Sequence, residues 1–391
     1  MVDRHADAFE QLRMVIMDGE PTDALVLQAG QVLIRAMDDA KGTANDGEHD
    51  EAKRLAILDL YSKSLQAHPR LHAIRGELAK SVASAGDANG AELYWDIEWQ
   101  AGRYNELADE YETQGNDEDA EEARAIADRL EDFIEDSQTD PMFILAHASM
   151  HGFLGEMNEA LRLFELAGEN THESENPAGV HIDIGRTALQ FGLVDLARDQ
   201  ATKAIESEDA SVMTWVAAAE IASFSGQFDV GAQRVEHAMT MDRFEEQSML
   251  MARAANATLQ QGNLETGRDL LRRAVANTDD PYEAFTIARG IAAGGASLGS
   301  ESMLNEGLEL IEGIIEEHPR IAIIRADLGS IYSQLGRWEA AQEHLVKAAE
   351  LSASNPTLAR KVADQFEAMG HTDEARVWYE ESQRRRDAMK P

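Results

Sequence analysis

Apolar residues recur along this chain at the three- and four-residue spacing of amphipathic helices, and the alternation typical of strands is nearly absent. The pattern predicts a helix over residues 5–18, ended by a Gly-Glu-Pro stretch, and a second helix over residues 22–38. Residues 41–51 are polar and contain glycine, so we expect an inserted surface loop there. A third helix is predicted over residues 52–67.

One segment, residues 320–385, contains the same pattern twice at a separation of 34 residues. The sequence positions Leu328, Tyr332, Gly336, Ala341 and Leu345 recur as Val362, Phe366, Gly370, Ala375 and Tyr379. A period of this length in helical sequence is typical of a tandem array of helix-turn-helix repeats. Each unit of such an array packs against its neighbours, so a long chain needs no single large core.

Glycines mark the turn expected inside each unit from residue 70 onwards. The glycines are Gly86, Gly115, Gly155, Gly192, Gly226, Gly262, Gly336 and Gly370, with separations of 29, 40, 37, 34, 36, 74 and 34 residues. A glycine that ends a helix can adopt the left-handed conformation without a Cβ clash. The separation of 74 equals two periods plus an insertion of six residues, which we place near residues 294–302.

A small residue follows each of these glycines five positions later. These residues are Ala91, Ala120, Ala160, Ala197, Gly231, Gly267, Ala341 and Ala375. They fall early in the second helix of each pair, where we expect the two helices to approach closely.

At the C-terminal end of the chain, residues 383–387 form a basic run. We expect this run to solvate the last helix and complement its dipole, or else to dock on another chain.

These positions resemble the tetratricopeptide repeat family over nearly all of the chain. The family pattern of large, apolar-plus-small, large, turn glycine, alanine, aromatic and alanine positions is matched by Tyr104, Leu107, Ala108, Tyr111, Gly115, Ala120 and Ala127, by Ile144, Ala148, Gly155, Ala160, Phe164 and Ala167, and by Trp215, Ala218, Ala219, Gly226, Val235 and Ala238. Arg124, His147 and His151 depart from it.

The resemblance implies an all-α fold, a right-handed superhelical solenoid of about nine antiparallel helix pairs. Residues 1–69 would form N-terminal helices and an imperfect first repeat with the inserted loop. Residues 70–387 would form the tandem repeats, continuous with the N-terminal part as one solenoid.

In this family the first helix of each pair lines a concave groove, and the resemblance implies which side chains would face a partner there. The strip is apolar with few charges, and methionines adapt to varied apolar ligands. Self-contact is the alternative use of the same strip. The implied positions are Met142, Leu145, Ser149, Phe153, Ile182, Asp183, Arg186, Leu189, Met213, Val216, Glu220, Phe224, Met249, Arg253, Asn256 and Leu259, of which Arg253 and Asn256 could hydrogen-bond a peptide.

The composition narrows the classes of partner. A formal net charge of −38 would repel nucleic acid and anionic membranes, and it favours a protein or peptide partner of positive charge, although solubility is the simpler explanation. The chain contains no cysteine, no secretory pattern at its start and no apolar run long enough to cross a membrane. We therefore expect a soluble, cytoplasmic protein without direct membrane insertion. The sequence leaves open whether a signal or anchor has been trimmed from it.

The most suggestive chemistry is a pair of histidines. His147 and His151 are four residues apart and share one helix face, and His181 could approach them. Ala148 stands where a zinc hydrolase motif needs glutamate, so packing histidines are favoured, and we expect no metal, cofactor or catalytic residue. The sequence predicts a non-enzymatic interaction scaffold. The alternatives are a self-assembling protomer, or the repeat portion of a larger enzyme.

Overall fold

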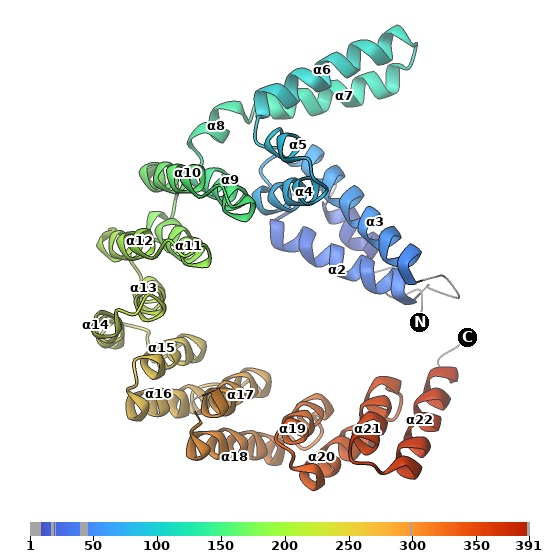
Figure 1. The fold of residues 1–391 in the computed structure, drawn as a ribbon, viewed down its shortest axis with the longest axis vertical. Helices are drawn as coiled ribbons and strands as arrows, with labels where there is room; N and C mark the ends of the chain where they lie inside the picture. The colour runs from blue at the N-terminus through green and yellow to red at the C-terminus, as the bar shows by residue number, and fades with distance from the viewer. Residues whose placement is uncertain (1–8, 17–18, 20, 40–45, 298, 389–391) are drawn as a thin grey trace. The chain divides into compact units, whose positions relative to one another are not determined.

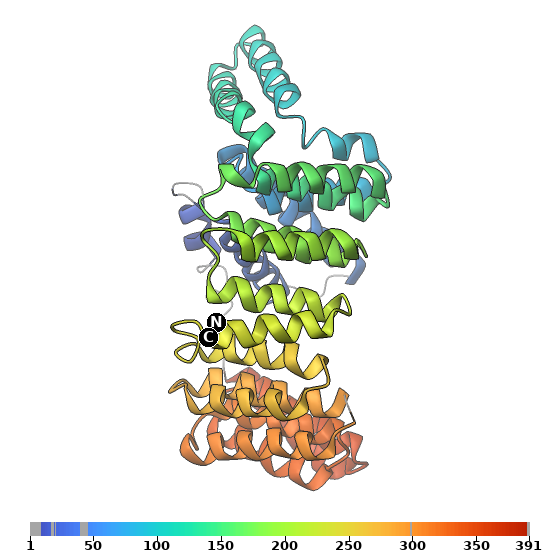
Figure 2. The same cartoon turned by 90° about the vertical axis from the view of Figure 1, so that its left-hand side faces the viewer.

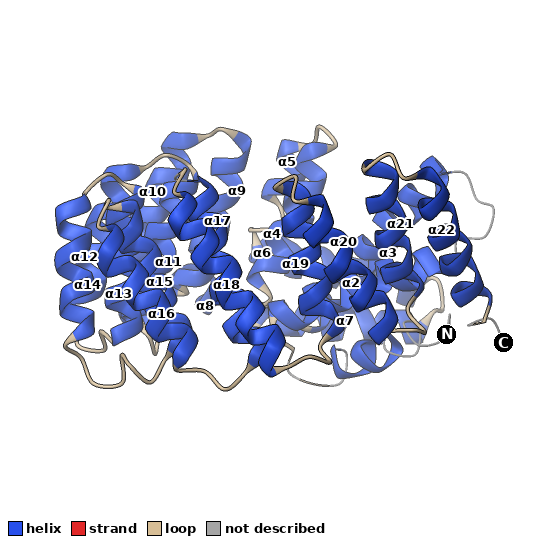
Figure 3. Ribbon diagram, turned by 90° about the horizontal axis from the view of Figure 1, so that it is seen from below, coloured by secondary structure: helices blue, strands red, loops and turns tan. Residues whose placement is uncertain are grey.

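The computed structural model describes residues 9–16, 19, 21–39, 46–297 and 299–388. Helices make up the secondary structure of these residues, and Figure 3 shows no strand among them. The chain divides into two compact units, Met1–Ala210 and Ser211–Pro391. The expected all-α fold is therefore confirmed, and each unit is described by itself.

The first unit begins with a helical stretch over residues 9–16 and continues through helices joined by short turns (Figure 1). Its helices are α2 (Asp23–Asp39), α3 (Asp46–Ala67), α4 (His72–Ser84), α5 (Ala88–Glu92), α6 (Ile97–Thr113), α7 (Asp117–Glu131), α8 (Ile134–Thr139), α9 (Pro141–Leu154), α10 (Met157–Glu169), the 3-10 turn η1 (Thr171–Glu173), α11 (Pro177–Gln190) and α12 (Val194–Glu206).

The second unit is a series of helix pairs in which each pair packs against the next. Its helices are α13 (Val212–Phe224), α14 (Phe228–Met239), α15 (Ser248–Gln260), α16 (Leu264–Ala276), α17 (Pro281–Ser297), α18 (Glu301–Glu317), α19 (Ala322–Gln334), α20 (Trp338–Leu351), α21 (Pro356–Ala368) and α22 (Thr372–Asp387). Neighbouring first helices also touch, as α13 and α15 do.

The turn glycines have the predicted conformation. All eight have positive φ; Gly226, for example, joins α13 to α14 at φ 78°. The structure adds Gly299 to the series, at φ 63° between α17 and α18. The separation of 74 residues is thus two equal steps of 37. The expected six-residue insertion is wrong as a local insert, because the extra residues lengthen α17 and α18 to 17 residues each.

The structure of the long pair α17–α18 also explains why the sequence pattern did not reveal its turn glycine. A Cβ on Gly295 would lie 2.3 Å from Leu304 N, and one on Gly307 would lie 2.4 Å from Ala292 N. The two backbones therefore approach each other through glycines. Gly307 comes eight residues after the turn glycine rather than five, so it falls outside the repeated pattern.

The first unit departs from prediction at α3. This helix begins at Asp46, so the part of the expected loop from residue 46 to residue 51 is helical. The rest of that loop, residues 41–45, lies outside the described residues. Acidic residues are favoured in the first turns of a helix. A polar run before an apolar segment therefore does not by itself indicate a loop.

The pair α6–α7 does not continue the stack as expected, because α4 packs directly against α9. Figures 1 and 2 both show the α6–α7 hairpin projecting away from α4 and α9. The preceding helix α5 has five residues, whereas α10 and α12 have 13 each. A second helix that short offers too little surface for the next pair, which fits the 29-residue step between Gly86 and Gly115.

Aromatic side chains fill the α4–α9 junction. The Trp95 and Phe143 rings meet edge to face at 5.2 Å between centroids, and Phe133 meets Phe143 in the same way at 5.6 Å. Trp95 Nε1 also donates to Met150 Sδ at 3.0 Å. This cluster fixes α5, the α7–α8 turn and α9 against one another.

Candidate functional site

The predicted partner-binding strip is most exposed on α13 and α15 of the second unit. Phe224 is 68% exposed, Met213 55% and Met249 44%. Val216 and Leu259, from the same predicted set, are buried in the core. The exposed members lie on the first helices of two neighbouring pairs, with Met213 and Phe224 near opposite ends of α13. We call this set the α13–α15 strip: Met213, Phe224 and Met249.

An ion pair crosses this strip. Arg253 Nε donates to Glu220 Oε1 at 2.9 Å and its terminal nitrogen donates to Glu220 Oε2 at 2.7 Å. Hydrogen bonding to Glu220 raises the pKa of Arg253 above its ordinary value. Arg253 is thus already engaged by a carboxylate on the neighbouring helix, while Asn256 on the same helix is exposed.

A shallow pocket of about 430 Å³ lies at one end of the α13–α15 strip. Met213 and Met249 line it together with Arg253. Its lining also includes three acidic side chains: Glu246, Asp279 and Glu283. The pocket thus combines two adaptable apolar side chains with a local excess of negative charge.

The predicted positions in the first unit are more mixed. Met142 and Phe153 on α9 are exposed, but Leu145 and Ile182 are buried. Ser149 bonds to the Leu145 carbonyl within its own helix at 2.8 Å. On α11, Leu189 is half-buried. An open pocket of about 400 Å³ is lined by Met142, Ser149, Asp183 and Arg186 among others.

Two charged groups of this region lie on α11. Burial raises the pKa of Asp183, opposed by Arg186, whose guanidinium lies 4.0 Å away. Both side chains are half-buried.

Four of the predicted contact positions thus belong to the core rather than to an accessible strip. They are Leu145, Ile182, Val216 and Leu259, each less than a tenth exposed. A helix that packs against its partner helix and both neighbouring pairs has a wide buried face. Register alone cannot separate positions at the edge of that face from positions that face solvent.

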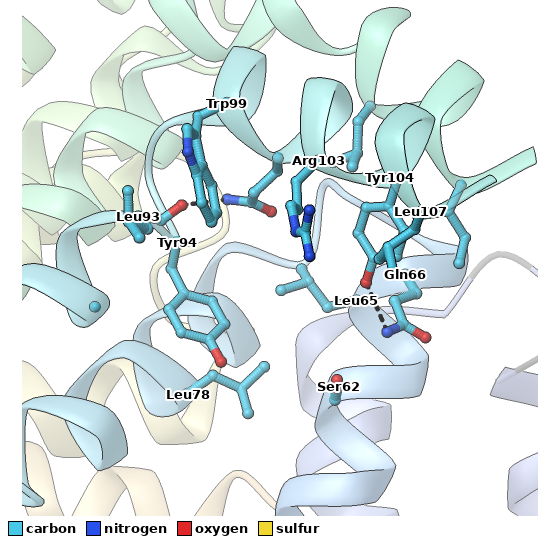
Figure 4. A pocket seen from close by; sticks show the side chains of 14 residues that line it. Ser62, Leu65, Gln66, Leu78, Leu93, Tyr94, Trp99, Arg103, Tyr104 and Leu107 are labelled. Atoms are coloured by element: carbon cyan, nitrogen blue, oxygen red, sulfur yellow. Dashed lines mark hydrogen bonds between the residues drawn. The ribbon is translucent and has the colours of Figure 1, made fainter. Parts of the chain in front are cut away.

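A pocket that the sequence did not indicate lies between α3, α4 and the projecting α6–α7 hairpin (Figure 4). It has a volume of about 340 Å³ and a mainly apolar lining that includes Leu65, Leu78, Tyr94 and Leu107. Figure 4 shows Trp99 and Arg103 on one side of it, and the Tyr104 hydroxyl bonded to the Gln66 amide at 2.8 Å.

This pocket can accommodate an apolar side chain or a small apolar ligand beside a few polar groups. The signal that could have found it is local: Tyr94, Trp95, Trp99 and Tyr104 fall within eleven residues of a chain with only 6% aromatic residues. This local density of aromatic residues indicates a special packing site. It does not predict that the α6–α7 hairpin leaves the stack and opens a pocket.

His147 and His151 meet a partner other than the expected one. His181 is bonded to Gln200 Oε1 at 2.6 Å and to Thr171 Oγ1 at 3.2 Å, away from the pair. The group that approaches instead is Glu92, whose Oε1 lies 2.8 Å from His147 Nε2. This hydrogen bond holds the pKa of Glu92 below its ordinary value. Glu92 is 55 residues away in sequence, so no local motif indicated it.

Together, these observations define the class of protein as an all-helical chain of tandem helix pairs with turn glycines between the two helices. The family model described as tetratricopeptide repeat matches residues 324–355, which span most of α19 and all of α20. Residues 324–355 are therefore similar to the tetratricopeptide repeat, in agreement with the resemblance found in the sequence. No curated protein matches it by sequence.

Solved structures that are similar to this chain include MamA AMB-1, which is 18% identical over 46% of this chain and 93% of that chain, with a TM-score of 0.29. Pseudomonas aeruginosa pilF is 14% identical over 51% of this chain and 88% of that chain, with a TM-score of 0.34. A monomeric IFIT1 mutant solved with Gppp-AAAA is 16% identical over 74% and 70%, with a TM-score of 0.29. These likenesses are too distant to transfer a role.

Among the described residues, no helix is both long and apolar enough to cross a lipid bilayer.

Proposed function

We propose that this chain is a non-enzymatic interaction scaffold that binds a peptide or helical segment of a partner protein on the α13–α15 strip. Proteins of tetratricopeptide repeat type generally mediate protein–protein interaction. The observation that carries the site is the exposure of Phe224, Met213 and Met249 on neighbouring first helices. Met213 and Met249 line one pocket, and exposed apolar side chains that lie together are typical of binding sites.

The size of this strip suggests a modest affinity. Full burial of three such side chains contributes roughly 5–9 kcal/mol before the costs of association are subtracted. After association costs of at least about 4 kcal/mol are subtracted, at most about 5 kcal/mol is left, which corresponds to a dissociation constant of about 0.2 mM at the tightest. A tighter complex would require further contacts, such as hydrogen bonds to Asn256.

The charge around the strip favours a partner segment with basic residues. Glu246, Asp279 and Glu283 line the pocket beside Met213 and Met249. The whole chain carries a net charge of −38, which would speed the encounter with a positively charged segment. We therefore expect ligands that combine an apolar anchor with neighbouring Lys or Arg.

Selection from a displayed library of random peptides tests this proposal. Wild-type protein should enrich peptides with apolar and basic residues together. The double variant Met213→Glu, Phe224→Glu should weaken binding of a selected peptide by at least about tenfold, because it places charge in an apolar contact. Val377→Glu is the matched control, since Val377 is equally exposed but lies on α22.

Unchanged peptide binding in the double variant, with the helical circular dichroism of wild type, would refute the site. Sedimentation of the free protein tests whether a second copy of the chain occupies the strip instead. A wild-type dimer that the double variant converts to monomer would assign the strip to self-association instead.

A further inference from the structure

We propose that Glu92, His147 and His151 form a binding site for a divalent transition-metal ion of the zinc type. The three side chains each offer a ligand atom, and these atoms lie within 4.8 Å of one another. The two histidines are one turn apart on α9, and Glu92 is the last residue of α5. The site would therefore join two helices that are distant in sequence.

The separations of the ligand atoms suit one small ion. His147 Nε2 lies 3.1 Å from His151 Nε2, and Glu92 Oε2 lies 3.4 Å from His151 Nε2. Tetrahedral zinc with bonds of about 2.0–2.1 Å requires its ligand atoms to stand roughly 3.3–3.4 Å apart. The two separations at His151 lie within about 0.3 Å of this value, and the 2.8 Å between His147 Nε2 and Glu92 Oε1 would have to widen by about half an ångström.

The hydrogen bond of Glu156 fixes the state of His151. Glu156 Oε2 lies 2.6 Å from His151 Nδ1. A carboxylate accepts but does not donate, so Nδ1 carries a proton and Nε2 is the nitrogen left to bind a cation. A carboxylate behind a histidine is the arrangement that orients histidine ligands in metal sites.

The His147 ring is held from two sides. Its Nε2 points to Glu92 Oε1 at 2.8 Å, and its face stacks on Trp95 with centroids 5.0 Å apart. His151 Nε2 lies 3.1 Å from His147 Nε2 and 3.4 Å from the second Glu92 oxygen, so the three groups converge on one point. A bound cation would replace the protons that now link these groups and satisfy all three ligand atoms at once.

The type and access of these ligands indicate the class of ion. Two imidazole nitrogens and one carboxylate suit zinc and its neighbours, whereas magnesium and calcium prefer sites made of oxygen ligands. His151 is buried, but the Glu92 side chain is 47% exposed, so an ion can reach the site from solvent. Three protein ligands leave a fourth position for water.

The site has a structural consequence for α5. A helix of five residues is too short to be stable by itself, and Glu92 is its last residue. A metal bond from Glu92 to two residues of α9 would hold α5 in place at the point where the α6–α7 hairpin leaves the stack.

Isothermal titration of the full chain with ZnCl₂, after chelator treatment, tests the proposal. We expect one site with a dissociation constant below about 1 µM, and no comparable heat with MgCl₂. Glu92→Gln and His147→Gln should each weaken zinc binding by roughly 100-fold or more. Glu156→Gln, a change in a positioning residue, should weaken it by about 10- to 100-fold.

His172→Gln is the control, because His172 lies in the same unit but is exposed on η1. It should bind zinc as the wild type does. Glu92 is partly exposed, so Glu92→Gln is expected to fold, and circular dichroism checks this. Binding weaker than about 10 µM in wild type, or equal binding by folded Glu92→Gln, would overturn the site and leave the cluster as hydrogen-bonded packing.

Discussion

At the scale of single residues, buried arginines satisfy backbone carbonyls that helices leave open. Arg385 is buried and donates to the carbonyls of Ala349 and Ser352 at 2.9 and 3.1 Å, at the end of α20. The last four carbonyls of a helix lack a partner within it, so this contact stabilises both elements. The expectation that the whole basic run 383–387 solvates the last helix is therefore wrong for Arg385.

Arg75 has the same function in the first unit. Its guanidinium is fully buried and donates to the carbonyls of Pro69 and Tyr94 at 2.9 and 2.5 Å. Burial lowers the pKa of Arg75 to about 9, so the group is still charged at neutral pH. A sequence shows only a charged residue on a helix here, because the carbonyls come from other segments.

The glycines provide a residue-scale prediction with a matched pair. Gly226→Ala forces a side chain into φ 78° and should destabilise the second unit by about 1–2 kcal/mol. Gly290→Ala lies inside α17, where an added Cβ meets nothing within 4 Å. It should stabilise by about 0.5–1 kcal/mol. The urea unfolding midpoints of the two variants should therefore shift in opposite directions. Equal shifts would contradict the backbone conformations assigned to Gly226 and Gly290.

At the scale of elements, Asp140 links α4 to α9. Its side chain accepts from Met142 N at 2.8 Å and Phe143 N at 3.3 Å, which caps α9, and also from His72 Nε2 at 2.9 Å, the first residue of α4. Burial by itself would raise the pKa of Asp140. The hydrogen bonds from His72 and the two backbone amides outweigh it, so the pKa lies below its ordinary value.

This lowered pKa predicts how the α4–α9 contact depends on pH. Because the carboxyl has a lower pKa when folded, its contribution is fully present above the unfolded pKa of about 4 and is lost as the pH falls through the folded value. Asp140→Asn keeps an oxygen for the cap but removes the charge. At pH 7 it should lower the stability of the first unit by about 1 kcal/mol.

The difference between Asp140→Asn and wild type should shrink towards zero as urea unfolding is repeated down to about pH 3. Asp96→Asn is the matched control, since Asp96 caps α6 through Trp99 N at 2.9 Å. A difference for Asp140→Asn that is constant with pH would show that the cap geometry, and not the charge, matters.

At the scale of the whole molecule, charge is the dominant property. The chain carries 73 acidic and 35 basic residues, and many local ion pairs such as Arg162 with Glu159 and Lys63 with Asp59 lie at the surface. Exposed pairs of this kind contribute little to stability. The excess of negative charge repels itself and opposes the folded state.

Salt should therefore stabilise this protein. Raising NaCl from about 20 mM to about 300 mM shortens the screening length from roughly 20 Å to roughly 6 Å. We expect the thermal unfolding midpoint at pH 7 to rise by several degrees. The rise should shrink at pH 5, near the isoelectric point of about 4.5. A midpoint that falls with salt at pH 7 would show that attractive ion pairs outweigh the repulsion.

The sequence by itself determined the helices, the turn glycines and the small residues that let paired helices approach, because these features are local and repeat with a fixed period. It could not detect Gly299, since longer helices shifted the small residue at Gly307 out of phase. It also could not separate buried Val216 from exposed Met213 on the same helix.

Only the tertiary structure decided which distant segments meet. The short helix α5 lets α9 pack on α4, and this packing brings Glu92 to His147 and opens the pocket beside Tyr104. Such contacts join residues that are tens of positions apart and depend on the lengths of several helices at once. No spacing rule within a single repeat contains that information.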